Sequence, residues 1–173
     1  TLNYPDFDDV YKLTMHDKDK NKYWFDGKWE ELEERKFKFK VKILGFLKIP
    51  VKQVYYWSKY GPTIRTKDGV YSIRFPANMD IRSAEQWYRM NKAKNFQEFK
   101  AALEMQSFSG INIVYADREH NIYYLCNGLF PYRNPSYDWK KVLPGDTSAT
   151  LWEEKFHPLN ELPQVLNPEC GYV

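Results

Sequence analysis

The clearest periodicity in the chain is the stretch KFKFKVKI at residues 36–43, in which lysines alternate strictly with apolar residues. Successive side chains of a strand point to opposite faces, so this pattern predicts a β-strand. One face carries four lysines and should be wet. The other should be buried and consists of Phe37, Phe39, Val41 and Ile43.

Weaker strand patterns surround this segment. YWF and KWEEL flank the pair Asp26-Gly27, which favours a tight two-residue hairpin turn. VKQVYYW and VYSIRF follow, separated by the turn-forming stretches GPT and KDG. Residues 1–80 are therefore expected to be rich in β-structure. A core hairpin is predicted within residues 108–133, where INIVYA is apolar on both faces, as in a strand covered on both sides, and IYYLCNG follows a polar turn.

Helical periodicity is confined to residues 81–107. Ser83 and Gln86 have the spacing of a capping box, and Trp87 then lies on an apolar face one turn from Met90. A second cap is indicated by Asn95, with an acidic residue three positions later and apolar residues at helical spacing after it. Two short helices and one kinked helix fit this pattern equally well.

Residues 134–173 show few periodic runs, and six prolines occur from Leu129 to the end. A long irregular segment of this kind indicates a functional loop or a segment that packs on something else. The elements together predict an α+β fold, mostly antiparallel sheet with one helical hairpin region. We expect residues 1–173 to form a single segment of one domain.

Composition narrows the function classes. Aromatic residues make up 18% of the chain, which favours sheet and contact with other surfaces. The net charge of +3 is too small to indicate a nucleic-acid partner. No apolar run approaches the roughly 20 residues of a membrane span, so no membrane partner is expected, and no signal peptide is present. Cys126 and Cys170 are too few for a metal site; a free buried thiol is the first interpretation and a disulfide the alternative.

Candidate chemistry is sparse. The three histidines have no metal-ligand spacing, and no phosphate-binding loop or nucleophile elbow occurs. The cluster Glu30–Glu34 is interpreted as a solvated face. Thr1 could act as an N-terminal nucleophile with its own amine as base, but an arbitrary chain boundary is the simpler interpretation. No catalytic residue, metal or cofactor is expected.

The C-terminal part resembles a known family through a series of ordered motifs. These are Asn112, Tyr115-Ala116-Asp117, Asn121-Ile122-Tyr124, Gly128-Pro131-Arg133, Pro144-Gly145, Trp152, Leu162-Pro163 and Asn167-Pro168-Gly171-Tyr172. In this order they resemble the penicillin acylase (penicillin amidase) family of N-terminal-nucleophile hydrolases. Asp9-Val10-Tyr11, Asp26-Gly27 with Trp29, and Tyr60-Gly61-Pro62 match more loosely. One departure is His120, where the family has a turn glycine.

The resemblance implies an αββα architecture in which an N-terminal serine attacks an amide and a downstream asparagine stabilises the oxyanion. Neither residue falls on this chain: the nucleophile would precede Thr1, and the asparagine would follow Val173. Two positions match substrate-pocket residues of the family, Trp87 and Ile111. A calcium ion of some members would correspond to the backbone of Trp139, with its other ligands outside this chain.

The sequence therefore predicts an internal, β-subunit segment of a periplasmic or extracytoplasmic bacterial amide hydrolase acting on small acylated substrates such as β-lactams or acyl-homoserine lactones. Its partners would be the remaining segments of the parent, or a second copy of the segment that hides uncovered apolar surface. The alternatives are a non-catalytic carbohydrate- or ligand-binding module rich in exposed aromatics and a pure interaction domain.

Overall fold

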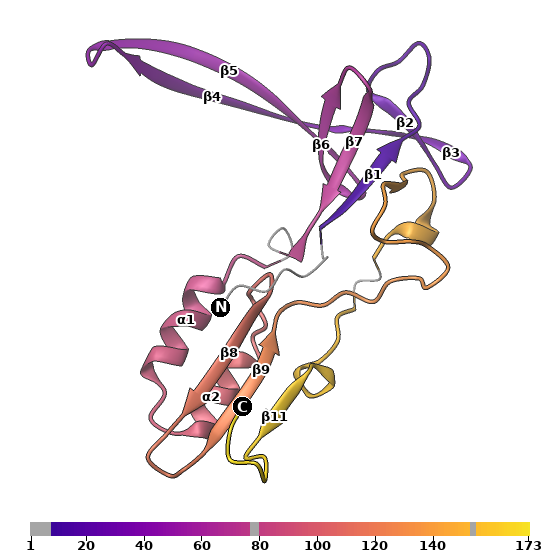
Figure 1. Ribbon diagram of the computed structural model, residues 1–173. Coiled ribbons are helices and arrows are strands. Elements are labelled where there is room, and N and C mark those ends of the chain that lie inside the picture. The colour runs from indigo at the N-terminus through magenta and orange to yellow at the C-terminus, as the bar shows by residue number, and fades with distance from the viewer. Residues whose placement is uncertain (1–7, 77–79, 153–154) are drawn as a thin grey trace. The chain divides into compact units, whose positions relative to one another are not determined.

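The computed structural model describes residues 8–76, 80–152 and 155–173, and groups them into two compact units (Figure 1). Unit 1 comprises residues 75–133 and 152–173, and unit 2 comprises Asp9–Arg74 and Asn134–Leu151. The predicted α+β class, mostly antiparallel sheet with two helices, is confirmed. No helix among the described residues is long and apolar enough to cross a membrane.

Unit 2 is built on a six-stranded sheet of order β10-β1-β7-β6-β5-β4. Every neighbouring pair is antiparallel except β1 with β10. The strands of this sheet are β1 (Asp9–Leu13), β4 (Glu33–Ile43), β5 (Leu47–Ser58), β6 (Gly61–Thr66), β7 (Gly69–Arg74) and β10 (Leu143–Pro144). A separate hairpin pairs β2 (Lys22–Phe25) with β3 (Lys28–Glu31), and a short 3-10 helix spans Ser148–Thr150.

The turn of the β2–β3 hairpin confirms the prediction from Asp26-Gly27. Asp26 has φ 45° and Gly27 has φ 83°, so both residues occupy the left-handed region that a two-residue turn of this type requires. The strands enclose an aromatic core in which the rings of Tyr11 and Tyr60 stack with centroids 4.2 Å apart. The Tyr60 hydroxyl donates to the Thr147 carbonyl at 2.6 Å, and burial raises the pKa of Tyr60 to about 12.

The predicted strand at residues 36–43 exists, but the prediction that its apolar face is buried is wrong. All eleven residues of β4 are exposed, and Phe37 and Phe39 keep about half of their surface in solvent. β4 and β5 pair over their whole length, whereas β6 pairs with β5 only from Tyr56 to Ser58. No other described segment of unit 2 covers this hairpin, so its apolar face stays exposed. The alternating pattern predicts the strand correctly but does not determine whether another layer covers it.

Unit 1 is a three-stranded sheet of order β11-β9-β8 with two helices on one face (Figure 1). Its elements are α1 (Ser83–Lys92), α2 (Phe96–Leu103), β8 (Ile111–Ala116), β9 (Ile122–Asn127), a 3-10 helix (Leu159–Glu161) and β11 (Gln164–Leu166). The core between helices and sheet consists of Phe96, Leu103, Ile113, Tyr123, Leu125, Leu159 and Leu162. Because Leu159 and Leu162 belong to this core, the irregular C-terminal segment is a structural part of the unit.

Of the two predicted helix caps, one is confirmed and one is wrong. The Asn95 side chain accepts from the Glu98 backbone N–H at 2.9 Å, and the Glu98 carboxylate accepts from the Lys94 backbone N–H, so α2 is capped as predicted. The N-cap of α1 is Arg82, which makes no side-chain capping bond. Ser83 lies inside the helix, and Gln86 is fully buried and bonded elsewhere.

The face of the three-stranded sheet away from the helices is uncovered by the described residues. Ile113 points to the helices and is 6% exposed, whereas its neighbour Val114 is 67% exposed. The expectation that β8 is covered on both sides is therefore not met by residues 8–76, 80–152 and 155–173. Cys126 and Cys170 are not joined in a disulfide; Cys126 is half-buried, and Cys170 is exposed rather than buried.

Candidate functional site

The two positions that resemble substrate-pocket residues both lie in unit 1. Trp87 is on α1 and keeps 53% of its surface exposed, with its ring edge-on to Phe108 at a centroid distance of 5.9 Å. Ile111 is the first residue of β8 and packs half-buried against the core of the unit. Trp87 thus does not belong to a buried helix face, as the periodicity indicated; it presents an apolar surface that the described chain leaves open.

A buried amide network connects α1, the helix that carries Trp87, to β9, the strand that pairs with the Ile111 strand β8. Gln86 donates from Nε2 to Asn127 Oδ1 at 2.9 Å, and Asn127 donates from Nδ2 to the Leu103 carbonyl at 3.0 Å. Gln86 and Asn127 are both fully buried. Asn127 is the register partner of Ile111 across the β8–β9 pair. The hydrogen bond therefore fixes the residue before Trp87 against the residue opposite Ile111.

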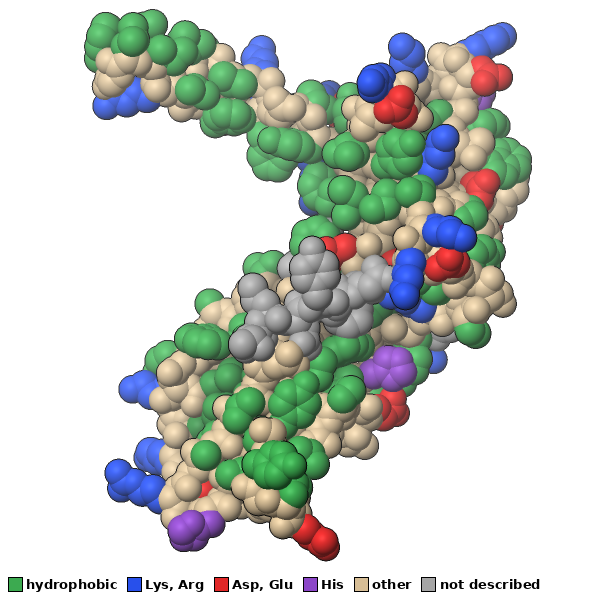
Figure 2. Space-filling view, in the orientation of Figure 1, with side chains coloured by type: hydrophobic (Ala, Val, Ile, Leu, Met, Phe, Trp, Pro, Cys, Tyr) green, Lys and Arg blue, Asp and Glu red, His purple; other side chains and the backbone are tan. Residues whose placement is uncertain are grey.

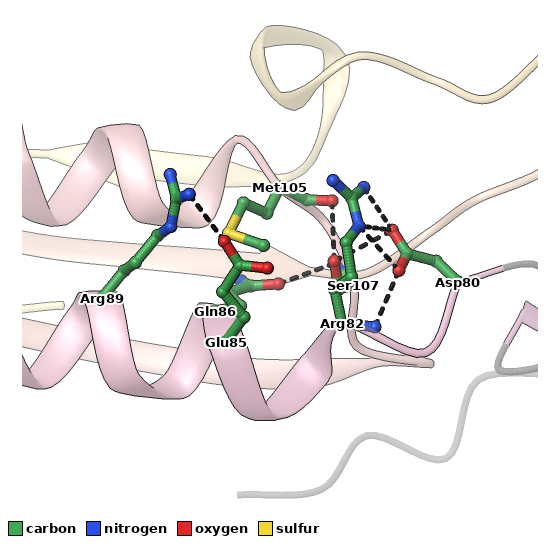
Figure 3. Close-up of polar contacts among 7 residues, drawn as sticks. All are labelled: Asp80, Arg82, Glu85, Gln86, Arg89, Met105 and Ser107. Carbon is green, nitrogen blue, oxygen red and sulfur yellow. Dashed lines mark hydrogen bonds and ion pairs between the residues drawn. The ribbon is translucent and has the colours of Figure 1, made fainter.

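The same network anchors the loop that leads from α2 to β8. The Ser107 backbone N–H donates to Gln86 Oε1 at 2.6 Å, and its hydroxyl donates to Asp80 Oδ2 at 3.0 Å (Figure 3). Asp80 in turn pairs with Arg82 at 2.6 Å, and this hydrogen bond to the guanidinium lowers the pKa of Asp80 to about 2. Ser107 is thus held by two hydrogen bonds, one from its backbone N–H to the neutral amide of Gln86 and one from its hydroxyl to the carboxylate of Asp80.

A close backbone approach fixes the position of the β8 N-terminus. Gln106 donates from Nε2 to the carbonyls of Gly128 and His157, at 3.0 Å each. A Cβ on Gly128 would lie 3.1 Å from the Cα of Gly110, the residue directly before Ile111. A side chain at position 128 would push the two backbone segments apart by a few tenths of an ångström, so glycine suits this close approach.

The polar side chains around Trp87 and Ile111 are engaged with one another or with the backbone. Asp80 is committed to Arg82, and Gln86, Asn127 and Ser107 satisfy one another. Among the described residues, no group of three or more His, Cys, Asp or Glu is placed to hold a metal ion. Thr1 lies outside the described residues. Trp139 is in unit 2, where its indole N–H donates to the Asn134 carbonyl.

Two of the histidines, His16 and His157, have structural partners, and the third, His120, lies in a turn. His16 Nδ1 accepts from two backbone N–H groups of its own loop at 3.1 Å, and His157 pairs with Glu161 at 2.8 Å. His120 has φ 65°, the left-handed region that favours glycine. This conformation gives the physical reason for the turn glycine that the resembled family has at this position.

Sequence reasoning missed the polar residues that organise the site. Gln86 was interpreted as part of a cap, and Asn127 and Ser107 were not singled out. A signal existed for Asn127, since it follows Tyr123 and Leu125 at the inward-facing phase of β9. A polar residue at a core position of a strand needs a hydrogen-bond partner, and that requirement indicates a buried network.

Comparison with known proteins places these features in a family. A family model for penicillin amidase matches residues 1–173. The chain is 26% identical over 173 residues to penicillin G acylase of Escherichia coli, covering all of this chain and 20% of that protein. It is 25% identical over 162 residues to the acyl-homoserine lactone acylase PvdQ of Pseudomonas putida, covering 83% of this chain and 21% of that protein.

The fold agrees with these relationships. A solved structure of a thermostable penicillin G acylase from Alcaligenes faecalis superposes over the whole of this chain and 31% of its own, with a TM-score of 0.83 at 24% identity. The chain spans about a fifth of the length of the two curated relatives and 31% of the solved structure. Since the family model covers every residue, the chain belongs to the penicillin amidase family.

Proposed function

We propose that this chain is a segment of an amide hydrolase that cleaves small acylated substrates such as β-lactams or acyl-homoserine lactones. In this proposal it supplies scaffold and acyl-pocket residues but no catalytic residue. The observation that carries the proposal is the half-exposed indole of Trp87 on α1. The buried Gln86–Asn127 bond ties this helix to the end of β9, directly opposite Ile111 at the start of β8. An apolar pocket wall of this kind discriminates acyl chains by their volume.

The uncovered face of the three-stranded sheet supports a role as a part of a larger fold. In an αββα architecture, which the family resemblance implies, two sheets pack face to face and each carries helices on its outer side. Here α1 and α2 cover one face, and the other bears Val114 and Val165, which are 67% and 40% exposed. We infer that the remaining segments of the parent supply the second sheet against this face.

The geometry of the exposed rings argues against the carbohydrate-binding alternative. A sugar-binding platform presents coplanar rings to one ligand. The ring pairs Trp24–Trp29, Phe37–Tyr55 and Trp87–Phe108 instead cross at 72°, 75° and 85°. The two rings of each pair pack edge to face against each other and do not form a flat platform on which a sugar could stack. This arrangement favours the acylase proposal over the carbohydrate-binding alternative.

The proposal is tested with two proteins, this chain and the complete parent enzyme. Both are assayed with a chromogenic phenylacetyl amide and with an acyl-homoserine lactone. We expect the parent to hydrolyse at least one substrate and this chain to hydrolyse neither. Hydrolysis by the chain that disappears in Thr1→Ala would identify Thr1 as a nucleophile and overturn the non-catalytic role.

A further inference from the structure

The hairpin of β4 and β5 forms an arm that the proposed function does not use. Beyond Tyr55 the two strands pair only with each other, up to the turn at residues 44–46 (Figure 1). On the β4 side the arm runs from Lys36 to Ile43, and eight residues at a rise of about 3.3 Å give it a length of roughly 26 Å. An isolated two-stranded ribbon of this length is marginally stable in water, which indicates that the arm is used against another surface.

One face of the arm is continuously apolar. Direct cross-strand pairs on this face are Phe39 with Val51, Val41 with Ile49, and Ile43 with Leu47. Figure 2 shows hydrophobic side chains along the arm and over its tip. The large apolar residues of this face, apart from the half-buried Val51, are 38–49% exposed, and no described segment of the unit covers them.

The turn at the tip carries exposed apolar residues, although its backbone conformation and its exposure to water both favour polar residues or glycine. Leu44 has φ 51° and Gly45 has φ 78°, so the turn needs two left-handed residues, for which Asn, Asp and Gly are preferred. Leu44 is nevertheless a leucine with 80% of its surface exposed, and Phe46 is 78% exposed. A residue that is unfavourable both for the turn and for the solvent is expected where it makes a contact elsewhere.

The opposite face of the arm is rich in lysine, with Pro50 and Val54 as its two uncharged residues. Residues 36–52 contain six lysines and no acidic residue, whereas the whole chain has a net charge of only +3, so the other residues together stand at −3. Lys38 lies directly opposite Lys52, and Lys42 opposite Lys48. Like charges in direct cross-strand pairs are destabilising. Among the described residues, none of these four lysines has a carboxylate within ion-pair distance, so the arm lacks its own counter-charge.

We propose that this arm is a peripheral docking element for an anionic phospholipid surface. Its apolar face and the tip residues Leu44 and Phe46 enter the interface, and the lysines reach around the narrow ribbon to the lipid phosphates. Such a surface supplies apolar and anionic partners together. A nucleic acid would leave the apolar face exposed, and a second arm would add like charge. The sequence indicated no membrane partner because it lacks a spanning segment, but a surface-bound hairpin needs none.

The inference is independent of the acylase proposal and is tested on the complete parent protein. Co-sedimentation is measured with vesicles of phosphatidylcholine alone and with vesicles containing phosphatidylglycerol. We expect binding to the anionic vesicles only. The double variants Leu44→Asp/Phe46→Asp and Lys42→Glu/Lys48→Glu should each weaken it by about tenfold or more, since each lysine near an anionic surface contributes measurably. Matched controls elsewhere in unit 2, Val142→Asp and Lys67→Glu/Lys140→Glu, should bind like the unchanged protein.

A second readout follows the tip directly. In Phe46→Trp, the emission of the added indole, taken as the difference from the unchanged protein, should shift to the blue on addition of anionic vesicles. The indole could instead emit in the blue without vesicles and not respond to them. That result would mean that the parent's own segments cover the arm, and it would overturn the proposal. Equal binding to both kinds of vesicle, or no binding, would overturn it as well. Hydrolysis of a soluble substrate by the tip variants should be unchanged.

Discussion

Replacement of Gln86 by leucine should destabilise unit 1 far more than its place on a surface helix indicates. The side chain is fully buried and makes two hydrogen bonds, with Asn127 Oδ1 at 2.9 Å and the Ser107 N–H at 2.6 Å. Leucine has a similar volume but satisfies neither group. A buried polar group left without a partner costs about 1–3 kcal/mol, so we expect the free energy of unfolding to fall by about 3 kcal/mol.

The measurement is urea unfolding of the 173-residue chain followed by far-ultraviolet circular dichroism, because both helices belong to unit 1. With an m-value of about 1–3 kcal/mol/M, the midpoint should fall by roughly 1–3 M. The matched control is Glu85→Leu, one position earlier on α1, which breaks only the exposed ion pair of Glu85 with Arg89. Such a pair contributes about 0.3–0.5 kcal/mol. Equal midpoints for the two variants would refute the structural role of the network.

Three further predictions concern single positions. Asn95→Ala should lower the free energy of unfolding by about 1 kcal/mol through loss of the α2 cap, with Gln97→Ala as an uncapped control in the same urea assay. His120→Gly should raise the free energy of unfolding by up to about 1 kcal/mol, because His120 has φ 65° and glycine adopts this conformation without strain. The control Glu119→Gly, at the neighbouring turn position, should not raise the free energy of unfolding. An equal gain in both variants would contradict the prediction. The folded-state pKa of Asp80, about 2, lies below its ordinary value of 3.8, so its ion pair stabilises fully above that value and less as the pH falls toward 2. Asp80→Asn should therefore be less stable than the unchanged chain at neutral pH, and most of this difference should be lost near pH 2. A difference that stays undiminished in acid would refute the assignment.

Sequence signals that act within a few residues predicted local structure well. Asp26-Gly27 specified a turn whose two left-handed residues are both present, and Asn95 with Glu98 specified the cap of α2. These signals succeed because the donor, the acceptor and the required backbone angles lie within one turn of chain. The strand at residues 36–43 is predicted for the same reason, since alternation depends only on the pleat. The strand at residues 111–116 is predicted from a short run that is apolar on both faces, which is also a local signal.

Burial and the polar network could not be read in this way, because both depend on what lies across the unit. The alternation at residues 36–43 cannot specify whether another layer covers Phe37 and Phe39. Gln86 bonds with Asn127, 41 residues away, and no local pattern announces such a pair. The positions of Trp87 and Ile111 came from family resemblance, and their role in binding stays a prediction. What the structure adds is the connection between them through Gln86 and Asn127.

The central claim is that Trp87 and Ile111 line an acyl pocket in the complete enzyme, and acyl preference tests it most directly. Each methylene in such a pocket changes discrimination by roughly 10–200-fold, so Ile111→Ala should raise kcat/KM for bulky relative to small acyl groups by about tenfold or more. The buried neighbour Ile113, on the same face of β8, provides the control: Ile113→Ala should lose about 2–5 kcal/mol of stability and keep its preference. The claim would be contradicted if Ile111→Ala destabilised the enzyme as much as Ile113→Ala does and left the ratio of kcat/KM for bulky and small acyl groups unchanged.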